Sequence, residues 1–168
     1  MIILLDGSKG AGKSTTAKIL CEHLKDSVYL GIDAERRALS EQEGTITERN
    51  QRAFQKILEK TELYLKEKRT IIIDCGLIEE RIPQIEKLAA ADGSSVYKFL
   101  LKASYETQLA RVRERDKARG KTTDEGRFAE VHSLVHAKSL EGFTVIETDV
   151  LSPQEIADTI LEKIKSND

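Results

Sequence analysis

The residues with the clearest chemical meaning lie near the N-terminus, in the segment Gly7-Ser-Lys-Gly-Ala-Gly-Lys-Ser14. It matches the pattern GxxxxGK[ST], in which glycines let consecutive backbone N–H groups surround a phosphate. We expect Lys13 to bridge the β- and γ-phosphates of a nucleotide, and the hydroxyl of Ser14 to ligate Mg²⁺. Thr15 is placed to donate to the α-phosphate. The segment therefore predicts a triphosphate site, whose loop is formed by Gly7, Gly10, Ala11 and Gly12.

Two carboxylates follow other apolar runs. Asp74 ends the run Thr70-Ile-Ile-Ile-Asp74, which is typical of a strand whose last carboxylate holds or orders the Mg²⁺ shell. Asp33 follows a second run, where a carboxylate can orient an attacking hydroxyl or accept its proton. Each has a simpler interpretation that stays open, since Asp74 could be a turn residue and Asp33 could cap a short helix.

Cationic side chains near these carboxylates are candidates for holding a second substrate. Arg36 lies one helical turn after Asp33, and its guanidinium could bind a phosphate or carboxylate of the acceptor. Arg81 is a further candidate for the acceptor side, to which Asp74 is also expected to contribute. Lys9, inside the glycine-rich segment, either adds charge near the γ-phosphate or is simply solvated.

A basic segment from residue 109 to residue 121 holds four Arg and two Lys against two acidic residues. Three of its arginines are spaced by four residues and share one helix face: Arg111, Arg115 and Arg119. Like charges at this spacing repel one another unless an anion binds between them. The segment therefore predicts a phosphate-clamping lid over about residues 111–127 that closes over the γ-phosphate, with an ordinary charged helix as the alternative.

The elements that must position these residues alternate along the chain. Short apolar runs predict strands over residues 2–5, 28–32, 70–73, 96–101 and 143–146. Helical patterns cover residues 13–25, 47–68, 79–91, 105–118, 124–140 and 153–164. This alternation predicts an α/β fold with a doubly wound sheet of about five parallel strands. If the third strand neighbours the first, the strand order is 2-3-1-4-5, as in small P-loop kinases. The length of 168 residues predicts one domain spanning residues 1–168.

The composition excludes several classes of protein. With 27 Lys and Arg against 29 Asp and Glu, the net charge is −2, which argues against a polybasic nucleic-acid module. Aromatic residues make up only 5%, which is poor material for a base-stacking surface. The apolar run at residues 2–5 is far too short for a membrane span, so we expect a cytoplasmic protein. Cys21 and Cys75 lack the spacing of a zinc site or disulfide framework, although Cys75 either meets substrate or packs beside Asp74.

Together these motifs resemble the P-loop kinases that phosphorylate hydroxyl acceptors, in particular the group of polynucleotide 5′-hydroxyl kinases, zeta-toxin-like kinases and adenylylsulfate kinases. The resemblance covers nearly the whole chain, through residues 7–15, Asp33-Ala-Glu-Arg36, residues 74–89, the spacing of Leu109 and Arg115, and residues 145–149. It implies that Asp33 activates the acceptor hydroxyl and that Arg36 contacts the acceptor's phosphate. It further implies that Arg111 and Arg115 hold ATP phosphates, and that Thr148 and Asp149 lie beside the adenine.

At some positions this sequence differs from the motifs of individual kinase families, which narrows the set of families that it resembles. Adenylylsulfate kinases usually carry Ser-Pro after the third strand, where this chain reads Asp74-Cys-Gly-Leu. Gluconate kinases carry Gly-His-Phe in the lid, which Arg119-Gly-Lys-Thr does not reproduce. The polynucleotide-kinase-like group matches best, and its acceptors range from RNA ends to small alcohols.

The sequence therefore predicts a kinase that uses ATP and Mg²⁺ to phosphorylate a hydroxyl acceptor, with Lys13, Asp33 and Arg115 as catalytic residues. Ser14 and Asp74 are expected to serve the metal. The absence of an Asn/Thr-Lys-x-Asp motif for reading guanine favours ATP over GTP. One alternative is a nucleoside monophosphate kinase, in which Arg36, Arg49, Arg52 or Arg81 would grip an acceptor phosphate. The other is a regulatory nucleotide-binding ATPase.

Overall fold

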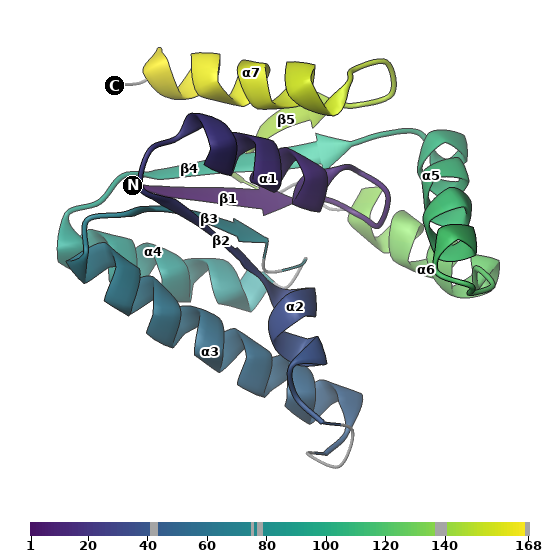
Figure 1. The fold of residues 1–168 in the computed structure, drawn as a ribbon, viewed down its shortest axis with the longest axis horizontal. Coiled ribbons are helices and arrows are strands. Elements are labelled where there is room, and N and C mark those ends of the chain that lie inside the picture. Colours follow the sequence, from purple (N-terminus) through teal and green to yellow (C-terminus); the bar gives the residue numbers. More distant parts are fainter. Residues whose placement is uncertain (41–43, 75, 77–78, 137–140, 167–168) are drawn as a thin grey trace.

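The computed structural model describes residues 1–40, 44–74, 76, 79–136 and 141–166. Its centre is a sheet of five parallel strands in the order β2-β3-β1-β4-β5, which confirms the predicted fold class and strand order. The strands are β1 (Ile2–Asp6), β2 (Ser27–Gly31), β3 (Thr70–Asp74), β4 (Val96–Lys102) and β5 (Thr144–Glu147) (Figure 1). Because the strands are parallel, the loops that follow them all begin at one edge of the sheet, where ligands bind in such folds.

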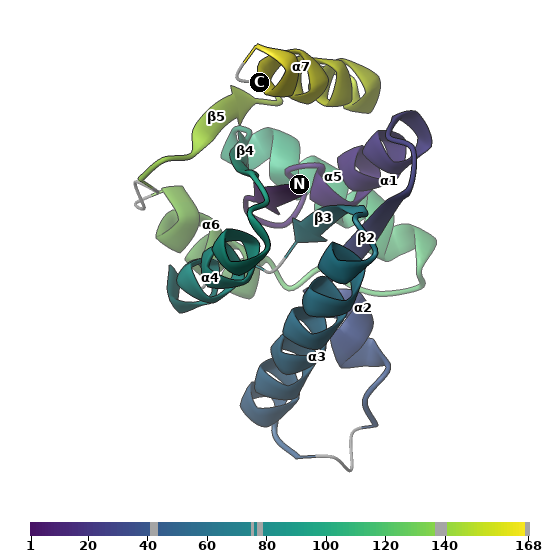
Figure 2. The same ribbon diagram turned by 90° about the vertical axis from the view of Figure 1, so that its left-hand side faces the viewer.

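Four helices cover the two faces of the sheet. α1 (Lys13–His23) and α7 (Pro153–Lys165) lie on one face, and α3 (Ile46–Lys66) and α4 (Ile82–Asp92) lie on the other (Figure 1). The same two layers of helices are seen from the side in Figure 2. α3 and α7 each begin at a capping box, Thr45 with Glu48 and Ser152 with Glu155, and the second of these agrees with the helix predicted over residues 153–164.

Strand β1 is buried on both faces, which explains why it is an uninterrupted apolar run. Ile2 and Leu4 pack into the core beneath α3 and α4, whereas Ile3 and Leu5 pack into the core beneath α1 and α7. The alternation follows from the two-residue period of a strand. Pairing with β3 and β4 on its two edges defines the register of β1 and so defines where the loop after Asp6 begins.

The remaining long helices form a hairpin beyond the carboxyl ends of the strands. α5 (Tyr105–Ala118) and α6 (Glu125–His136) pack on each other through a small core of Leu109, Val112 and Phe128 (Figure 1). This hairpin occupies the predicted lid segment. No helix in the described ranges is long and apolar enough to cross a membrane.

The structure differs from the predicted elements in two places. Ile32 is not the last residue of a strand but begins a short helix, α2 (Ile32–Arg37), whose N-cap is Gly31. Asp33 is therefore inside this helix and does not cap it. Residues Glu79–Arg81 form a separate 3₁₀ turn before α4, which begins at Ile82 with Pro83 in its first turn, where proline is favoured. The predicted end of the helix over 124–140 lies outside the described residues.

Candidate active site

The glycine-rich segment forms a tight loop between β1 and α1. Gly10 has φ +84°, and a Cβ atom there would lie 2.6 Å from the backbone oxygen of Gln108. A Cβ atom at Gly7 would clash with the backbone oxygen of Leu101. The Asp6 carboxylate accepts a hydrogen bond from the Gly7 amide at 2.7 Å. Glycine is required at both positions because β4 and α5 pack closely against the loop. This packing holds the loop in a fixed conformation.

The start of α1 is open to an anion. Its N-cap is Gly12, which supplies no side-chain hydrogen bond, and its first turn contains no acidic residue. The first N–H groups of this helix and the positive end of its dipole therefore face the loop without a protein carboxylate to neutralise them. Lys13 Nζ donates to the backbone oxygens of Gly7 at 2.7 Å and Ser8 at 3.2 Å. This arrangement fits the phosphate chain of a nucleotide.

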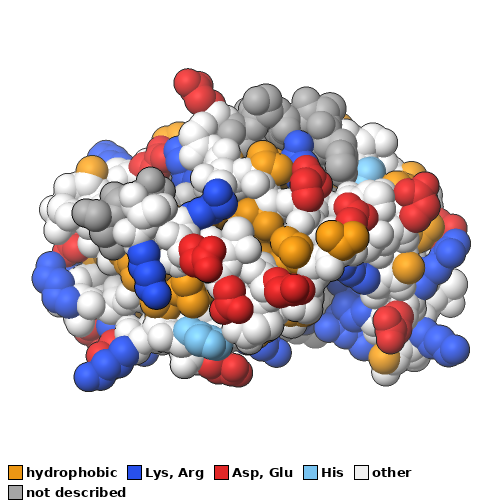
Figure 3. Space-filling model, turned by 90° about the horizontal axis from the view of Figure 1, so that it is seen from above, with side chains coloured by type: hydrophobic (Ala, Val, Ile, Leu, Met, Phe, Trp, Pro, Cys, Tyr) orange, Lys and Arg blue, Asp and Glu red, His pale blue; other side chains and the backbone are white. Residues whose placement is uncertain are grey.

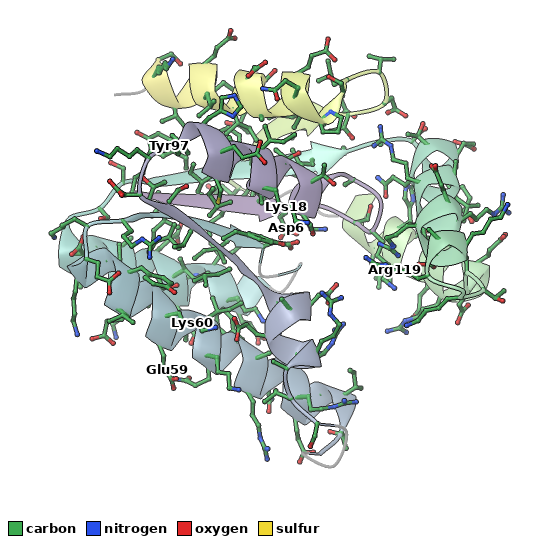
Figure 4. The ribbon with its side chains drawn as sticks, viewed as in Figure 1. Asp6, Lys18, Glu59, Lys60, Tyr97 and Arg119 are labelled. Atoms are coloured by element: carbon green, nitrogen blue, oxygen red, sulfur yellow. The ribbon has the colours of Figure 1, made fainter. Side chains whose placement is uncertain are left out.

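A cavity of about 700 Å³ opens at this edge of the sheet. It brings together predicted residues from four parts of the chain: Lys9, Gly10, Gly12, Lys13, Ser14, Thr15, Asp33, Asp74, Arg111, Arg115 and Arg119. Seven basic and two acidic side chains line it. Figure 3 shows Lys and Arg side chains gathered toward the hairpin end of the molecule, and Figure 4 labels Lys18 on α1 and Arg119 on the hairpin. The excess of positive charge suits a polyanionic ligand.

Asp74 and Ser14, the expected metal ligands, both interact with Tyr29, which the sequence did not predict as a site residue. The Tyr29 hydroxyl donates to Ser14 Oγ at 3.3 Å and lies within the electrostatic influence of the Asp74 carboxylate. Burial raises the pKa of Asp74 above its usual range, while the charge of Lys13 opposes this rise. Burial, together with the charge of Asp74, raises the pKa of Tyr29 to about 12, so Tyr29 remains a hydrogen-bond donor at neutral pH.

The described residues contain no cluster of three or more His, Cys, Asp or Glu side chains that could hold a metal alone. Mg²⁺ does not need such a cluster, because it keeps several waters and is bound through one or two protein oxygens together with substrate phosphates. The buried Asp74 carboxylate and the Ser14 hydroxyl at the start of α1 supply such oxygens. Ser14 and Asp74 therefore fit a magnesium ion that arrives with a nucleotide.

Helix α2 brings Asp33 to the cavity but turns Arg36 away from it. The Arg36 guanidinium pairs with Asp33 at 2.7 Å and donates to Oδ1 of Asn50 on α3 at 3.2 Å. Arg36 is absent from the cavity lining, whereas Ala34 and Arg37 are part of it. Spacing alone did not distinguish the two adjacent arginines, because the rotation of α2 is set by its packing on α3.

The α5 arginines lie as their spacing predicts. Arg111 donates to the backbone oxygens of Gly10 at 3.3 Å and Thr148 at 2.8 Å, which ties the hairpin to the loop. Arg115 pairs with Asp116 at 3.0 Å. Arg119, at the end of α5, also lines the cavity. Three cations therefore approach the loop from the hairpin, of which only Arg115 is held by a carboxylate in the described structure.

The residues expected beside the adenine have structural contacts instead. Thr148 is fully buried, and its hydroxyl donates to the Ala11 backbone oxygen at 3.4 Å. Asp149 accepts hydrogen bonds from the amide and hydroxyl of Ser104, which lower the pKa of its carboxyl. Neither side chain lines the cavity. The apolar part of the lining comes from the next segment and from α7: Leu151, Pro153 and Ile156.

Two further candidates lie elsewhere. Arg81 is buried with its guanidinium over the ring of Phe54, 5.0 Å from the ring centroid, and it does not line the cavity. Cys75 lies outside the described residues. Seven lining residues were not predicted from the sequence: Lys18, Tyr29, Ala34, Arg37, Leu151, Pro153 and Ile156. One signal was available for Lys18, which follows Ser14 by four residues and so shares its helix face.

Comparisons with solved structures show the same fold across almost the whole chain. The tunicamycin resistance protein of Deinococcus radiodurans is 19% identical, with a TM-score of 0.70 over 98% of this chain and 95% of that one. The APS kinase of Mycobacterium tuberculosis, solved with AMPPNP and APS, is 16% identical, with a TM-score of 0.66 over 98% and 96%. The shikimate kinase of Acinetobacter baumannii, solved with shikimate, is 23% identical, with a TM-score of 0.60 over 99% and 93%.

No curated protein matches the sequence. A family model described as an AAA domain matches residues 2–145, which run from the start of β1 into β5 and include the glycine-rich loop, α2 and the α5–α6 hairpin. This match covers most of the chain and all of the elements that approach the cavity except α7. The chain therefore belongs to the AAA domain family.

Proposed function

We propose that this protein is a Mg²⁺-dependent kinase that transfers the γ-phosphate of ATP to a hydroxyl group of an acceptor. The observation that carries the proposal is the cavity, in which one wall is the phosphate loop, another is α2 with Asp33, and a third is the arginine-bearing hairpin. A switch or motor needs room for an attacking water, whereas a kinase needs room for a whole acceptor molecule in line with the γ-phosphate. The open space beside Asp33 supplies that place.

On the nucleotide side, the loop amides and the start of α1 bind the phosphates, Lys13 bridges the β- and γ-phosphates, and Thr15 contacts the α-phosphate. Leu151, Pro153 and Ile156 give an apolar surface for the base. Arg111 is already fixed to the loop through Gly10, so it meets the phosphates without a large rearrangement. Thr148 and Asp149 act indirectly, since they hold the loop and the start of α5.

On the acceptor side, Asp33 orients the hydroxyl and accepts its proton as the hydroxyl oxygen bonds to the γ-phosphorus. The bond from that phosphorus to the bridging oxygen breaks at the same time, and ADP leaves with the bond's electron pair. Lys13 and Arg115 stabilise the negative charge on the transferred group. For Arg115 this requires release from Asp116 when the hairpin closes. Ser14 and Asp74 would hold Mg²⁺, whose charge would neutralise the phosphate oxygens.

The named activities of similar structures support this proposal. Two of them are an APS kinase solved with AMPPNP and a shikimate kinase solved with shikimate. Both combine the fold found here with a small-molecule substrate. A nucleic-acid 5′-hydroxyl end remains a second kind of acceptor that the same chemistry would serve.

The test is transfer of labelled γ-phosphate from ATP to a panel of acceptors: RNA and DNA 5′-hydroxyl ends, nucleosides, nucleoside monophosphates, sugars, hydroxy acids and aminoglycoside-like alcohols. We expect labelled product with one class of alcohol and loss of transfer, with ATP affinity retained, in Asp33→Asn. Transfer to nucleoside monophosphates at their phosphate would favour the nucleotide-kinase alternative. Equal ATP turnover with and without every acceptor would favour a regulatory ATPase and contradict the proposal.

A further inference from the structure

We propose that Arg37 forms a subsite for an oxyanion of the acceptor, so that the acceptor is an alcohol carrying a phosphate, sulfate or carboxylate close to the reacting hydroxyl. This inference rests on the proposed kinase function and narrows its substrate class. The sequence pattern favoured Arg36 for such a contact. The structure instead brings its neighbour, Arg37, into the cavity.

The contacts of α2 explain why Arg37 is the arginine that lines the cavity. One face of the helix is bonded to α3: Glu35 pairs with Lys60 at 2.5 Å, and Arg36 donates to Asn50 at 3.2 Å. Lys60 is labelled on α3 in Figure 4. These two contacts fix the rotation of a helix that is only six residues long. Asp33, Ala34 and Arg37 are thereby left on the face toward the cavity.

Arg37 has no competing partner in the described part of the chain. Its side chain is exposed, and no ion pair or hydrogen bond links it to another described residue. Asp33, four residues earlier, pairs with Arg36 instead. Residues four apart on a helix have Cβ atoms about 6 Å apart, so Arg37 and Asp33 contact neighbouring parts of one bound molecule.

The basic side chains that line the cavity come from different sides of it. Lys13 at the loop and the arginines of α5 serve the nucleotide phosphates, and α5 follows β4 on one side of β1. Arg37 follows β2, on the other side of β1, so α2 and the hairpin face the loop from different directions (Figure 1). Closing the hairpin over a neutral acceptor would withdraw the Arg37 guanidinium from water without a counter-ion, which is unfavourable. An oxyanion on the acceptor provides that counter-ion, in the bidentate geometry that arginine favours.

The first test compares matched acceptors that differ by one anionic group: gluconate with sorbitol, glycerol 3-phosphate with glycerol, and a nucleoside 3′-phosphate with the nucleoside. We expect kcat/KM to be roughly 10- to 100-fold higher for the anionic member of the productive pair, as for other charged hydrogen bonds. Arg37→Gln should remove most of this preference, while the KM for ATP and the rate with the neutral member stay within about twofold. Arg37→Lys should restore part of it. Lys66→Gln, which removes a cation from the exposed side of α3, is the matched control and should behave as wild type.

The second test measures binding, so that its result does not depend on turnover. With the nucleotide site saturated by Mg²⁺ and AMPPNP, inorganic phosphate is titrated into wild type, Arg37→Gln and Lys66→Gln by calorimetry. We expect saturable binding that weakens at least tenfold in Arg37→Gln alone. Binding that is absent in wild type, or unchanged in Arg37→Gln, overturns the subsite, as does equal transfer to anionic and neutral acceptors. If phosphate binds through Arg37 but no acceptor of any class is phosphorylated, the subsite stands and the kinase proposal fails.

Discussion

The hydroxyl of Tyr29 donates a hydrogen bond to Oγ of Ser14 at 3.3 Å and so links strand β2 to the first turn of α1. The charge of Asp74, at the end of β3, acts on the same hydroxyl and helps to raise its pKa. The space around the hydroxyl is limited, since a Cβ atom on Gly31 would lie 2.6 Å from the Tyr29 hydroxyl oxygen. Tyr29 therefore holds Ser14 and lies near Asp74, the two groups that fit Mg²⁺.

Replacing Tyr29 tests this link. Tyr29→Phe keeps the ring and removes a hydrogen bond worth roughly 1 kcal/mol, so we expect the Mg²⁺ concentration for half-maximal activity to rise about fivefold. The kcat at saturating Mg²⁺ should change less, because Tyr29 orients the ligands and does not touch the transferred group. Gly31→Ala, which would displace the hydroxyl without removing it, should raise the Mg²⁺ requirement in the same way. Tyr64→Phe on α3 is the matched control, and an unchanged Mg²⁺ titration in Tyr29→Phe would contradict the link.

We expect the ionised Asp74 carboxylate to lower the free energy of unfolding of the ligand-free protein. Its pKa is raised by burial, so the folded state favours the protonated carboxyl, and stability decreases as pH rises through the raised pKa. Asp74→Asn mimics the protonated form. We therefore expect this variant to have a higher Tm than wild type at neutral pH, with the difference shrinking as pH falls toward the ordinary pKa of an aspartate.

The same substitution should lower Mg²⁺-dependent transfer on the order of 100-fold, because a charged group that serves the metal is lost. Thermal unfolding from pH 4 to pH 8 and labelled transfer measure the two effects separately. A Tm that falls at neutral pH, or full activity in Asp74→Asn, would show that Asp74 is only a structural residue at the end of β3.

Lys13 provides the most direct test of nucleotide binding. Among the described residues, its Nζ donates to the backbone oxygens of Gly7 and Ser8 in the loop, and both are groups that it can leave for a phosphate. Lys13→Ala should weaken ATP binding roughly 10- to 100-fold, the effect of losing a charged hydrogen bond, and should lower the Tm without ligand slightly, because the Lys13 charge also favours the buried Asp74 carboxylate. Calorimetric titration of ATP checks the first part. Tight ATP binding in Lys13→Ala would contradict the phosphate-loop assignment.

The sequence was sufficient for those parts of the site that depend on local chain geometry. The glycine-rich loop was predictable because its pattern specifies backbone conformation and hydrogen bonding within eight consecutive residues. The position of Asp74 was predictable because an apolar run ending in a carboxylate marks the carboxyl edge of a parallel strand. The arginines of α5 followed from the four-residue spacing of a long helix.

The parts that were missed depend on contacts between distant segments. Arg36 and Arg37 are adjacent, and only the bonds from α2 to Lys60 and Asn50 decide which of them lines the cavity. Tyr29 has the pattern of an ordinary strand residue in the sequence. Its place at the site depends on the packing of β2 beside β3 and beneath α1, which the sequence alone does not give. Arg81 carries a charge that suits an acceptor anion, but its guanidinium packs over the ring of Phe54 and does not line the cavity.

Asp149 distinguishes a structural role from a nucleotide contact at the base of the hairpin. It accepts hydrogen bonds from both the amide and the hydroxyl of Ser104 at the start of α5, and these bonds lower the pKa of its carboxyl. A lowered pKa means that the stabilisation is present above the ordinary aspartate pKa and is lost as pH falls through the lowered value. Asp149→Ala should therefore lower the Tm at neutral pH, and the difference from wild type should shrink in acid. Asp158→Ala, on the exposed side of α7, is the control and should show a smaller difference. The Asp149 side chain does not line the cavity, so we expect Asp149→Ala to change the Tm more than it changes the KM for ATP. A rise in the KM for ATP with an unchanged Tm would instead place Asp149 beside the adenine.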